Sequence, residues 1–300
     1  MVNLKISLPD GFLEEEYRDG YLVSSQMKKV WAVELDLLAE FMRVCEKYHI
    51  KWYADAGTIL GAARHKGMIP WDDDIDVMMM RHEYDRFIQL ASKDFKYPYY
   101  LQSGYETCHC HLQLRNSETT GILKYNINDR YNFNQGIFLD IFPVDNKIDD
   151  DKLFSEQCSS IEKLKLMAFQ YRLLKESRQY KSQVKRFLFK NLLKKSFEIV
   201  TNSTPLIYSI DSIASKYNDI ESDEVCKLIL PPFTKRRIWK KKWFDDTCYL
   251  PFEFLTIPVP SGYKELLETF YGNWEEYVIG TSSHGSTFFD VDKSYNEYIK

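Results

Sequence analysis

The sequence contains no long apolar segment and few of the residues that mark unfolded or cross-linked chains. No stretch approaches the roughly 18 uncharged apolar residues of a membrane-spanning helix, and the N-terminal segment turns acidic before an apolar signal region can form. Only 12 glycines and 10 prolines occur among 300 residues, which excludes collagen-like and low-complexity chains. The six cysteines are scattered, as is typical of reduced thiols. We therefore expect a folded cytoplasmic protein.

Aromatic residues, in contrast, are abundant. The 6 Trp, 21 Tyr and 19 Phe supply enough apolar surface for a large core. The net charge of -4 is unevenly distributed, because residues 151–200 are strongly basic and the rest of the chain is acidic. This overall acidity and the lack of a recognisable nucleic-acid-binding motif argue against a nucleic acid as partner.

Hydrophobic periodicity predicts an α+β protein. Apolar residues at helical spacing predict a helix over residues 27–49, and a second, short helix is expected to follow residues 55–58 and to end near Arg64. Strands are expected over residues 50–54, 75–80, 99–102, 111–115 and 136–142, the last ending at Pro143. From residue 149 to about residue 217 the strand signals stop and the pattern becomes helical. We interpret this stretch as a helical insertion.

The run Cys108-His109-Cys110-His111 contains four side chains that can bind zinc. Alternation along a strand would place the two histidines on one face and the two cysteines on the other. No second ligand pair with zinc-finger spacing follows. We therefore favour an interpretation without a metal at this run.

The segment that ends in Trp71-Asp72-Asp73-Asp74-Ile75-Asp76-Val77 is the most informative in the chain. On an extended backbone, Asp72, Asp74 and Asp76 share one face and Asp73 points away from them. Three carboxylates on one face repel one another unless a cation neutralises them. Hard divalent cations prefer oxygen ligands, so the segment predicts a site for Mg²⁺ or Mn²⁺.

A solvated acidic turn and an EF-hand loop are two other interpretations of this segment. A solvated acidic turn would not run directly into the apolar residues 77–80, whose pattern is that of a sheet. An EF-hand loop starting at Asp72 would need glycine at its sixth position, which is Val77 here. The metal-binding strand explains the pattern better than either alternative.

Gly57-Thr58 lies at the turn before the short helix. Backbone N-H groups and a hydroxyl at such a turn can bind a phosphate, although a plain helix cap has the same residues. The cations Arg64, His65 and Lys66 lie between this turn and the acidic segment. Phosphoryl transfer requires both phosphate donors and a metal-binding strand, so the combination favours that chemistry.

Downstream, residues 136–143 (GIFLDIFP) contain one carboxylate, Asp140, in an otherwise apolar strand. An isolated buried carboxylate is costly unless it is paired or bound to a metal. We predict that Asp140 is a third metal ligand or a general base, and a structural ion pair is the alternative.

These residues carry a resemblance to a known family. Residues 55–77 (DAGTILGAARHKGMIPWDDDIDV) resemble the signature of the LicD family, which is related to fukutin and has a polymerase-beta-like nucleotidyltransferase core. Residues 136–143 resemble its second motif, and residues 252–254, 258–260 and 271–274 resemble its C-terminal block. The likeness spans residues 25–147 and 243–300.

The resemblance implies a nucleotidyltransferase-like mixed sheet flanked by helices. We therefore expect a catalytic core over residues 1–148, a basic helical insertion over residues 149–222, and a C-terminal segment over residues 223–300 that packs back on the core. Together they are expected to form one compact unit.

The resemblance also implies an activity, the transfer of phosphocholine or a related phospho-amine. The donor would be CDP-choline or a similar CDP-amine, and the acceptor a sugar hydroxyl of a cell-surface glycan precursor, in lipopolysaccharide or teichoic acid biosynthesis. By carry-over, Asp74 and Asp76 would be the paired metal ligands and Asp140 the third carboxylate, with Mg²⁺ or Mn²⁺ as cofactor. Asp72 is an additional candidate ligand. The candidate substrate-binding residues are Gly57, Thr58, Arg64, His65, Lys66 and Trp71; a ring such as Trp71 suits a quaternary ammonium group.

Other functions remain open at this point. The same metal strand would serve a nucleotidyltransferase that moves a nucleoside monophosphate from an NTP to a sugar or small-molecule acceptor. A calcium- or nucleic-acid-binding module is a third possibility. The basic segments 184–195 and 235–243 could contact an anionic membrane that carries a lipid-linked acceptor, which would place the protein at the inner face of that membrane; solvated helix faces are the alternative.

Overall fold

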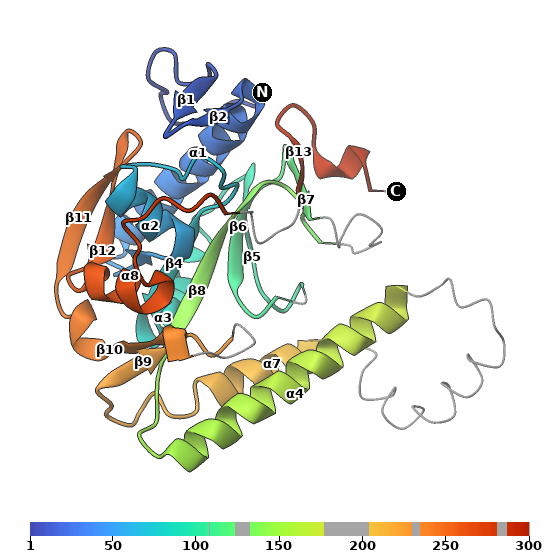
Figure 1. Cartoon of the computed structure of the whole chain (residues 1–300). Coiled ribbons are helices and arrows are strands. Elements are labelled where there is room, and N and C mark those ends of the chain that lie inside the picture. Colours follow the sequence, from blue (N-terminus) through green and yellow to red (C-terminus); the bar gives the residue numbers. More distant parts are fainter. Residues whose placement is uncertain (108, 124–132, 177–203, 230–234, 281–286, 300) are drawn as a thin grey trace.

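The computed structural model describes residues 1–107, 109–123, 133–176, 204–229, 235–280 and 287–299 (Figure 1). Its core is a seven-stranded mixed sheet. The strands of this sheet are β3 (Tyr53–Ala54), β4 (Asp76–Met80), β5 (Tyr99–Gln102), β6 (Leu112–Asn116), β8 (Phe138–Asn146), β9 (Glu224–Cys226) and β10 (Ile238–Lys240). Three antiparallel hairpins or pairs complete the strands: β1 (Glu16–Arg18) with β2 (Tyr21–Val23), β11 (Thr247–Phe252) with β12 (Leu255–Pro260), and β7 (Thr120–Leu123) with β13 (Thr287–Asp290).

Helices flank this sheet. They are α1 (Ser25–Lys47), α2 (Ala56–Arg64), α3 (Arg81–Ala91), α4 (Asp151–Glu176), α7 (Thr204–Ala214) and α8 (Tyr263–Tyr271), with the short 3-10 turns η2 (Lys235–Arg237), η3 (Lys241–Phe244) and η4 (Tyr295–Glu297). Helix α1 packs on β6 and β8, and α3 packs on β4 and β8. The mixed sheet and its flanking helices confirm the predicted α+β class.

Strand β8 is the centre of the sheet. It pairs in parallel with β4, so that Asp76 lies beside Asp140 and Met80 lies beside Val144. On its other edge it pairs antiparallel with β6 and then, at its C-terminal end, with β9. Because β4 and β8 run in the same direction, their N-terminal ends bring the two sequence motifs together at one edge of the sheet.

The strand predicted to end at Pro143 continues through it to Asn146, so this boundary was wrong. The N-H of Asp140 donates to the carbonyl of Ile75, on the β4 side of the strand. Backbone N-H groups alternate between the two edges of a strand, so residue 143 would donate towards the opposite edge. There the pairing with β6 ends at Ile141 and the pairing with β9 begins at Asp145. Pro143 therefore lies at the gap between two partners, where the missing donor is tolerated.

Helix α1 confirms the helix that the hydrophobic periodicity predicted over residues 27–49. Ser24 caps α1 by accepting a hydrogen bond from the Met27 N-H, at 3.2 Å, and the apolar face of the helix is buried against the sheet. The strand expected over residues 50–54 is shorter, limited to β3. The other predicted strands lie within one or two residues of β4, β5 and β6.

The described residues between 151 and 214 are helical, as their sequence pattern predicts. Helices α4 and α7 pack on each other and lie side by side at one end of the molecule in Figure 1. Ile161 of α4 belongs to the same buried cluster as Ile207 and Ile210 of α7. The basic segment 184–195 lies outside the described residues. Within the described part of the chain, no helix is both long and apolar enough to cross a membrane.

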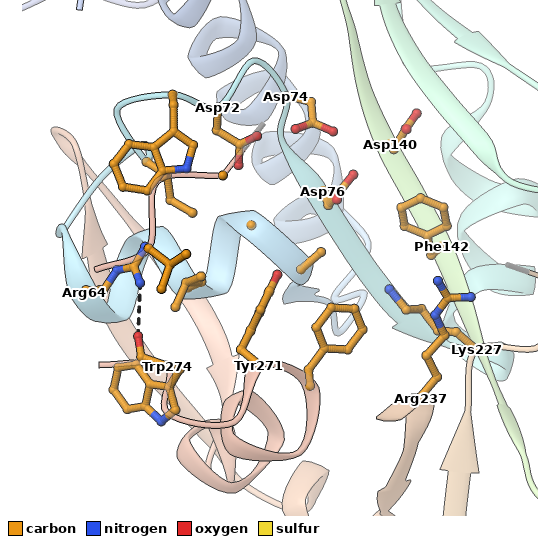
Figure 2. A pocket seen from close by; sticks show the side chains of 18 of the residues that line it. Arg64, Asp72, Asp74, Asp76, Asp140, Phe142, Lys227, Arg237, Tyr271 and Trp274 are labelled. Carbon is orange, nitrogen blue, oxygen red and sulfur yellow. Dashed lines mark hydrogen bonds between the residues drawn. The ribbon is translucent and has the colours of Figure 1, made fainter. Parts of the chain in front are cut away.

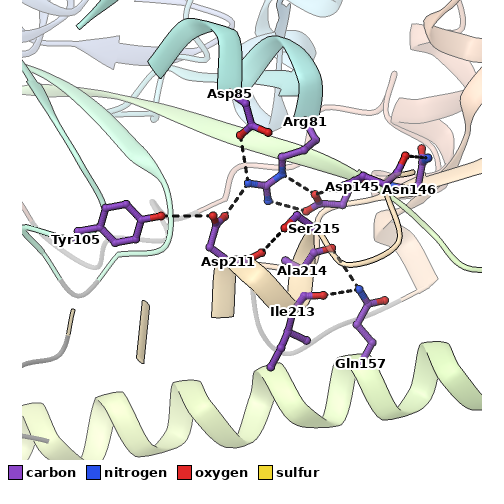
Figure 3. A network of polar contacts seen from close by, with 11 residues as sticks. Arg81, Asp85, Tyr105, Asp145, Asn146, Gln157, Asp211, Ile213, Ala214 and Ser215 are labelled. Atoms are coloured by element: carbon purple, nitrogen blue, oxygen red, sulfur yellow. Dashed lines mark hydrogen bonds and ion pairs between the residues drawn. The ribbon is translucent and has the colours of Figure 1, made fainter. Parts of the chain in front are cut away.

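A buried network of ion pairs connects α7 to the sheet (Figure 3). Arg81, at the start of α3, donates through Nε and Nη2 to the Asp145 carboxylate of β8, at 2.7 and 3.0 Å. Its Nη1 donates to Asp211 of α7, at 2.7 Å. Asn218 adds a hydrogen bond to Asp145, at 2.8 Å. The network thus joins three elements that are far apart in the sequence.

Candidate functional site

A cavity of about 760 Å³ opens where β4 and β8 begin (Figure 2). Its walls come from α2 with the following loop, from β4 and β8, and from the C-terminal residues 270–280, with further residues from β6, the segment before it, β7 and the β9–β10 region. Five carboxylates line it: Asp72, Asp74, Asp76, Asp140 and Glu276. The structure therefore brings together all four carboxylates that the sequence analysis assigned to a metal site.

Asp74 and Asp76 lie in a strongly acidic environment. Burial raises the pKa of both carboxyl groups well above the usual value, and neighbouring carboxylates raise it further. For Asp76, the largest such contribution comes from Asp140, its register partner on β8. Ionised oxygens on neighbouring strands are the donors that hard divalent cations prefer, so the residues present fit Mg²⁺ or Mn²⁺.

Strand alternation predicted that Asp73 points away from the other carboxylates, and this prediction was wrong. Oxygens of Asp72, Asp73 and Asp74 all lie within 4.8 Å of one another. The reason is that β4 begins only at Asp76, so residues 72–75 are not strand and do not alternate. Asp73 is buried and is not among the residues that line the cavity.

Asp140 has polar partners besides the other carboxylates. Gln113 of β6 donates to its Oδ1 at 2.7 Å, and His111 Nε2 lies 3.3 Å from the same oxygen. Burial alone would raise the pKa of Asp140, but His111 and the hydrogen bond from Gln113 lower it to about 2. Arg115 in turn donates to Gln113, at 2.6 Å. These contacts hold the Asp140 side chain in one orientation at the cavity wall.

The turn before α2 is built around close backbone approach. The Asp55 carboxylate caps the helix by accepting from the Ala56 N-H, at 2.8 Å, and Ala56 adopts a positive φ of 42°. A Cβ at Gly57 would overlap Oδ2 of Asp72, so any larger residue here would require the Asp72 carboxylate to move. Ala56 and Gly57 both line the cavity. A strained backbone of this kind is often found at a functional site.

The other residues predicted from this motif take different positions. Thr58 is buried behind the cavity wall, where its Oγ1 accepts the N-H of Asp76 at 2.8 Å. Arg64 lines the cavity, whereas His65 and Lys66 are not among the lining residues. His65 lies 2.6 Å from the Asp19 carboxylate, and the Lys66 side chain is exposed. The cations of the motif are therefore split between the cavity and the surface around it.

The C-terminal block closes one side of the cavity. Arg64 Nη1 donates to the carbonyls of Trp274 and Glu276, at 3.1 and 2.9 Å, and so holds this segment over α2. Tyr271, Trp274 and the predicted Trp71 line this side. Burial and the nearby carboxylates raise the pKa of Tyr271, which keeps its hydroxyl protonated. The aromatic side of the cavity is thus formed by two segments about 200 residues apart.

Sequence reasoning missed several polar residues that line the cavity, among them two cations and two histidines. Lys227 and Arg237 come from the end of β9 and from η2, and no local motif surrounds Lys227 in the sequence. His109 and His111 also line the cavity, with ring centroids 5.3 Å apart. The alternation of the Cys-His run, which predicted that the two histidines share a face, was the available signal for them.

The basic segment 235–243 does not form one amphipathic helix. It consists of η2, β10 and η3, with Trp239 buried and Arg237 on the cavity wall. Lys240 is exposed and pairs with Glu224 of β9, at 2.7 Å. A membrane contact of this segment stays a prediction.

Comparisons with known proteins agree with this geometry. Residues 49–182 match the family model described as LicD/FKTN/FKRP, nucleotidyltransferase domain. The lipopolysaccharide cholinephosphotransferase LicD of Haemophilus influenzae is 29% identical over 251 residues, which cover 80% of this chain and 88% of that protein. Uncharacterized proteins of Rickettsia typhi and Rickettsia prowazekii are each 32% identical, over 103 and 105 residues; these matches cover 32% of this chain and 31% and 39% of those proteins. The motifs around Asp74, Asp76 and Asp140 fall within the matched residues, so this part of the chain is similar to the LicD/FKTN/FKRP nucleotidyltransferase domain.

Proposed function

We propose that this chain is a transferase that moves phosphocholine from CDP-choline to a sugar hydroxyl of a cell-surface glycan, such as lipopolysaccharide. The observation that carries the proposal is the meeting of Asp76 and Asp140 in register on β4 and β8, inside a cavity that also has an aromatic side. The similarity to a lipopolysaccharide cholinephosphotransferase over 80% of the chain supports the choice of substrates.

In this proposal, Asp74, Asp76 and Asp140 hold a divalent cation, with Asp72 as a further ligand. When bound, Mg²⁺ or Mn²⁺ neutralises the diphosphate and stabilises the charge that develops on the departing CMP. The protein fixes the ligand set from two strands: Thr58 holds the backbone of Asp76, and Gln113 holds the side chain of Asp140.

The reaction is a single displacement at the phosphorus of the phosphocholine group. The acceptor oxygen forms a bond to this phosphorus, and the bond from phosphorus to the bridging oxygen breaks. CMP leaves with that electron pair, and the acceptor hydroxyl loses its proton to solvent or to a carboxylate of the cavity. The cavity aligns the acceptor oxygen opposite the leaving oxygen, and the reaction is fastest when both are in line.

The aromatic side of the cavity suits the choline group. A quaternary ammonium cannot donate a hydrogen bond, and aromatic faces attract it through the cation–π interaction. Trp71, Tyr271 and Trp274 line this side. Figure 2 shows Tyr271 and Trp274 on the side of the cavity away from Asp140. We propose that the amine of the donor lies against these rings.

Product analysis tests the proposed function. The purified chain is incubated with Mg²⁺, a lipopolysaccharide or glycan extract, and either CDP-choline, CDP-ethanolamine or each NTP. We expect CMP and a phosphocholine-labelled glycan from CDP-choline, and no product from a double Asp74→Asn/Asp76→Asn variant. Release of pyrophosphate from an NTP, without CMP from CDP-choline, would instead support nucleoside monophosphate transfer.

A further inference from the structure

Two cations lie on the cavity wall across from the aromatic side. Lys227 follows the last residue of β9, and Arg237 precedes the first residue of β10. These strands pair antiparallel, with Ile238 opposite Cys226. The next position of the same register places Lys227 opposite Arg237, and both side chains line the cavity. Figure 2 shows their nitrogens next to each other, beside Phe142 and across the cavity from Arg64 and Trp274.

This arrangement is electrostatically unfavourable by itself. Like charges directly opposite each other on two strands destabilise a sheet. Burial adds to the cost, because Lys227 is only 2% exposed and desolvation lowers the pKa of Arg237. A cost of this kind at a cavity wall is typical of a site that binds a ligand of opposite charge.

One carboxylate outside the metal cluster offsets part of this positive charge. Asp55, the N-cap of α2, forms a buried ion pair with Lys227 and also stabilises the charged form of Arg237. Its own oxygen Oδ1 is already used by the helix cap. Asp55 thus interacts with both cations, and the side chains of both cations also line the cavity.

We propose that Lys227 and Arg237 bind the diphosphate of the nucleotide donor. This inference rests on the proposed function, which supplies a donor with two adjacent anionic phosphates. The carboxylates at the other wall cannot contact a phosphate without a cation between them, whereas an ammonium and a guanidinium bind phosphate oxygens directly. Phe142, with its ring centroid 4.9 Å from Lys227 Nζ, limits the access of water and strengthens these contacts.

An anionic group of the acceptor glycan could in principle use the same two cations. The donor explains the position better, because Lys227 and Arg237 line the same cavity as the carboxylates Asp74, Asp76 and Asp140. One diphosphate in this cavity can contact both cations and a divalent cation held by the carboxylates. The two sources are separated by measuring KM for donor and for acceptor independently.

Arg237→Gln is the main test, with Arg236→Gln as the matched control. Arg236 is the preceding residue of η2, is exposed, and does not line the cavity. We expect Arg237→Gln to raise KM for CDP-choline on the order of tenfold, because a charge-assisted contact to phosphate is lost. KM for the acceptor should stay unchanged, and Arg236→Gln should behave like the parent. Unchanged donor KM in Arg237→Gln, or an increase in the acceptor KM alone, would overturn the assignment.

Lys227 needs a different variant, because its removal leaves Asp55 buried without its ion-pair partner. We therefore combine Lys227→Met with Asp55→Asn, which removes both charges and keeps a good N-cap residue. With circular dichroism confirming the fold, this double variant should also raise the donor KM on the order of tenfold. A folded double variant with the parent donor KM would contradict a role for Lys227.

Pyrophosphate binding separates this inference from the proposed function. Calorimetry with pyrophosphate and Mg²⁺ measures the phosphate site without any donor or acceptor. If the parent binds pyrophosphate and Arg237→Gln binds it on the order of tenfold more weakly, the phosphate site stands even if CDP-choline gives no product. Equal binding by Arg237→Gln, Arg236→Gln and the parent would refute the phosphate site while leaving the transferase proposal intact.

Discussion

Buried charged residues lie at both ends of the β4–β8 pair, but they have different neighbours at the two ends. At the N-terminal end, Asp76 and Asp140 are register partners and line the same cavity. The Asp140 carboxylate raises the pKa of both Asp76 and Asp74. At the C-terminal end, Arg81 directly follows β4 and pairs with Asp145 of β8 in a two-pronged ion pair. The distance between the two clusters is only the length of a five-residue strand.

The difference lies in the neighbours of each charge. Arg81 has carboxylate partners on β8 and α7, so burying its charge yields a stable link between elements. The carboxylates at the cavity lie next to one another, and burial together with their mutual repulsion raises the pKa of Asp74 and Asp76. We infer that the first cluster stabilises the fold and that the second is completed by a bound cation.

The largest expected effect comes from removing Arg81 from its ion pairs with Asp145 and Asp211. Arg81→Met should lower the free energy of unfolding by about 3–5 kcal/mol, because Asp145 is fully buried and would be left without its counter-charge. Urea denaturation measures this loss, which should not depend on Mg²⁺. Arg86→Met, which removes the ion pair between the half-exposed Arg86 and Glu83, should cost clearly less. A similar small loss in both variants would show that the Arg81 network contributes little to stability.

Neutralising a carboxylate of the cavity cluster should leave the fold intact and remove the activity. Asp74→Asn and Asp76→Asn should each reduce turnover on the order of a hundredfold or more, because an amide binds a divalent cation far less well than a carboxylate. Circular dichroism and melting should stay close to the parent, since each change relieves repulsion. Asp85→Asn, an exposed carboxylate near Arg81, is the control. Near-normal turnover at saturating Mg²⁺ would contradict the assignment.

A smaller effect is expected from the residue that positions the cavity strand. Thr58→Val keeps the side-chain shape but removes the oxygen that accepts the Asp76 N-H. We expect a loss of about 1–3 kcal/mol in stability, the cost of a buried donor without a partner. Turnover should fall less than in Asp76→Asn. Thr269→Val, whose hydroxyl bonds within its own exposed helix, should change neither property. Equal results for both threonines would argue against a positioning role for Thr58.

The parts of the site that could be predicted from sequence are those encoded by local patterns. The segment around Asp76 and the strand around Asp140 each have a short pattern that specifies a strand and a polar residue on it. The turn before α2 was equally visible, because its cap residue Asp55 and Gly57 are only two positions apart in the sequence. Their meeting at one sheet edge followed from the family resemblance rather than from periodicity.

The parts that could not be predicted depend on pairing between distant segments. Lys227 and Arg237 reach the cavity because β9 and β10 pair in one particular register, which no local pattern specifies. The partners of Arg81 likewise come from β8 and from α7, 130 residues further along the chain. Asp73 was misplaced because alternation was extended beyond the start of β4 at Asp76.

The most direct test of the difference between the two clusters is the melting temperature with and without Mg²⁺. Bound Mg²⁺ should raise the melting temperature of the parent by several degrees at concentrations well above its dissociation constant, because a ligand that binds only the folded state stabilises it. The double Asp74→Asn/Asp76→Asn variant should show no such rise, whereas Arg81→Met should melt lower but keep it. A parent protein whose melting temperature does not respond to Mg²⁺ or Mn²⁺, or a double variant that responds like the parent, would contradict the account.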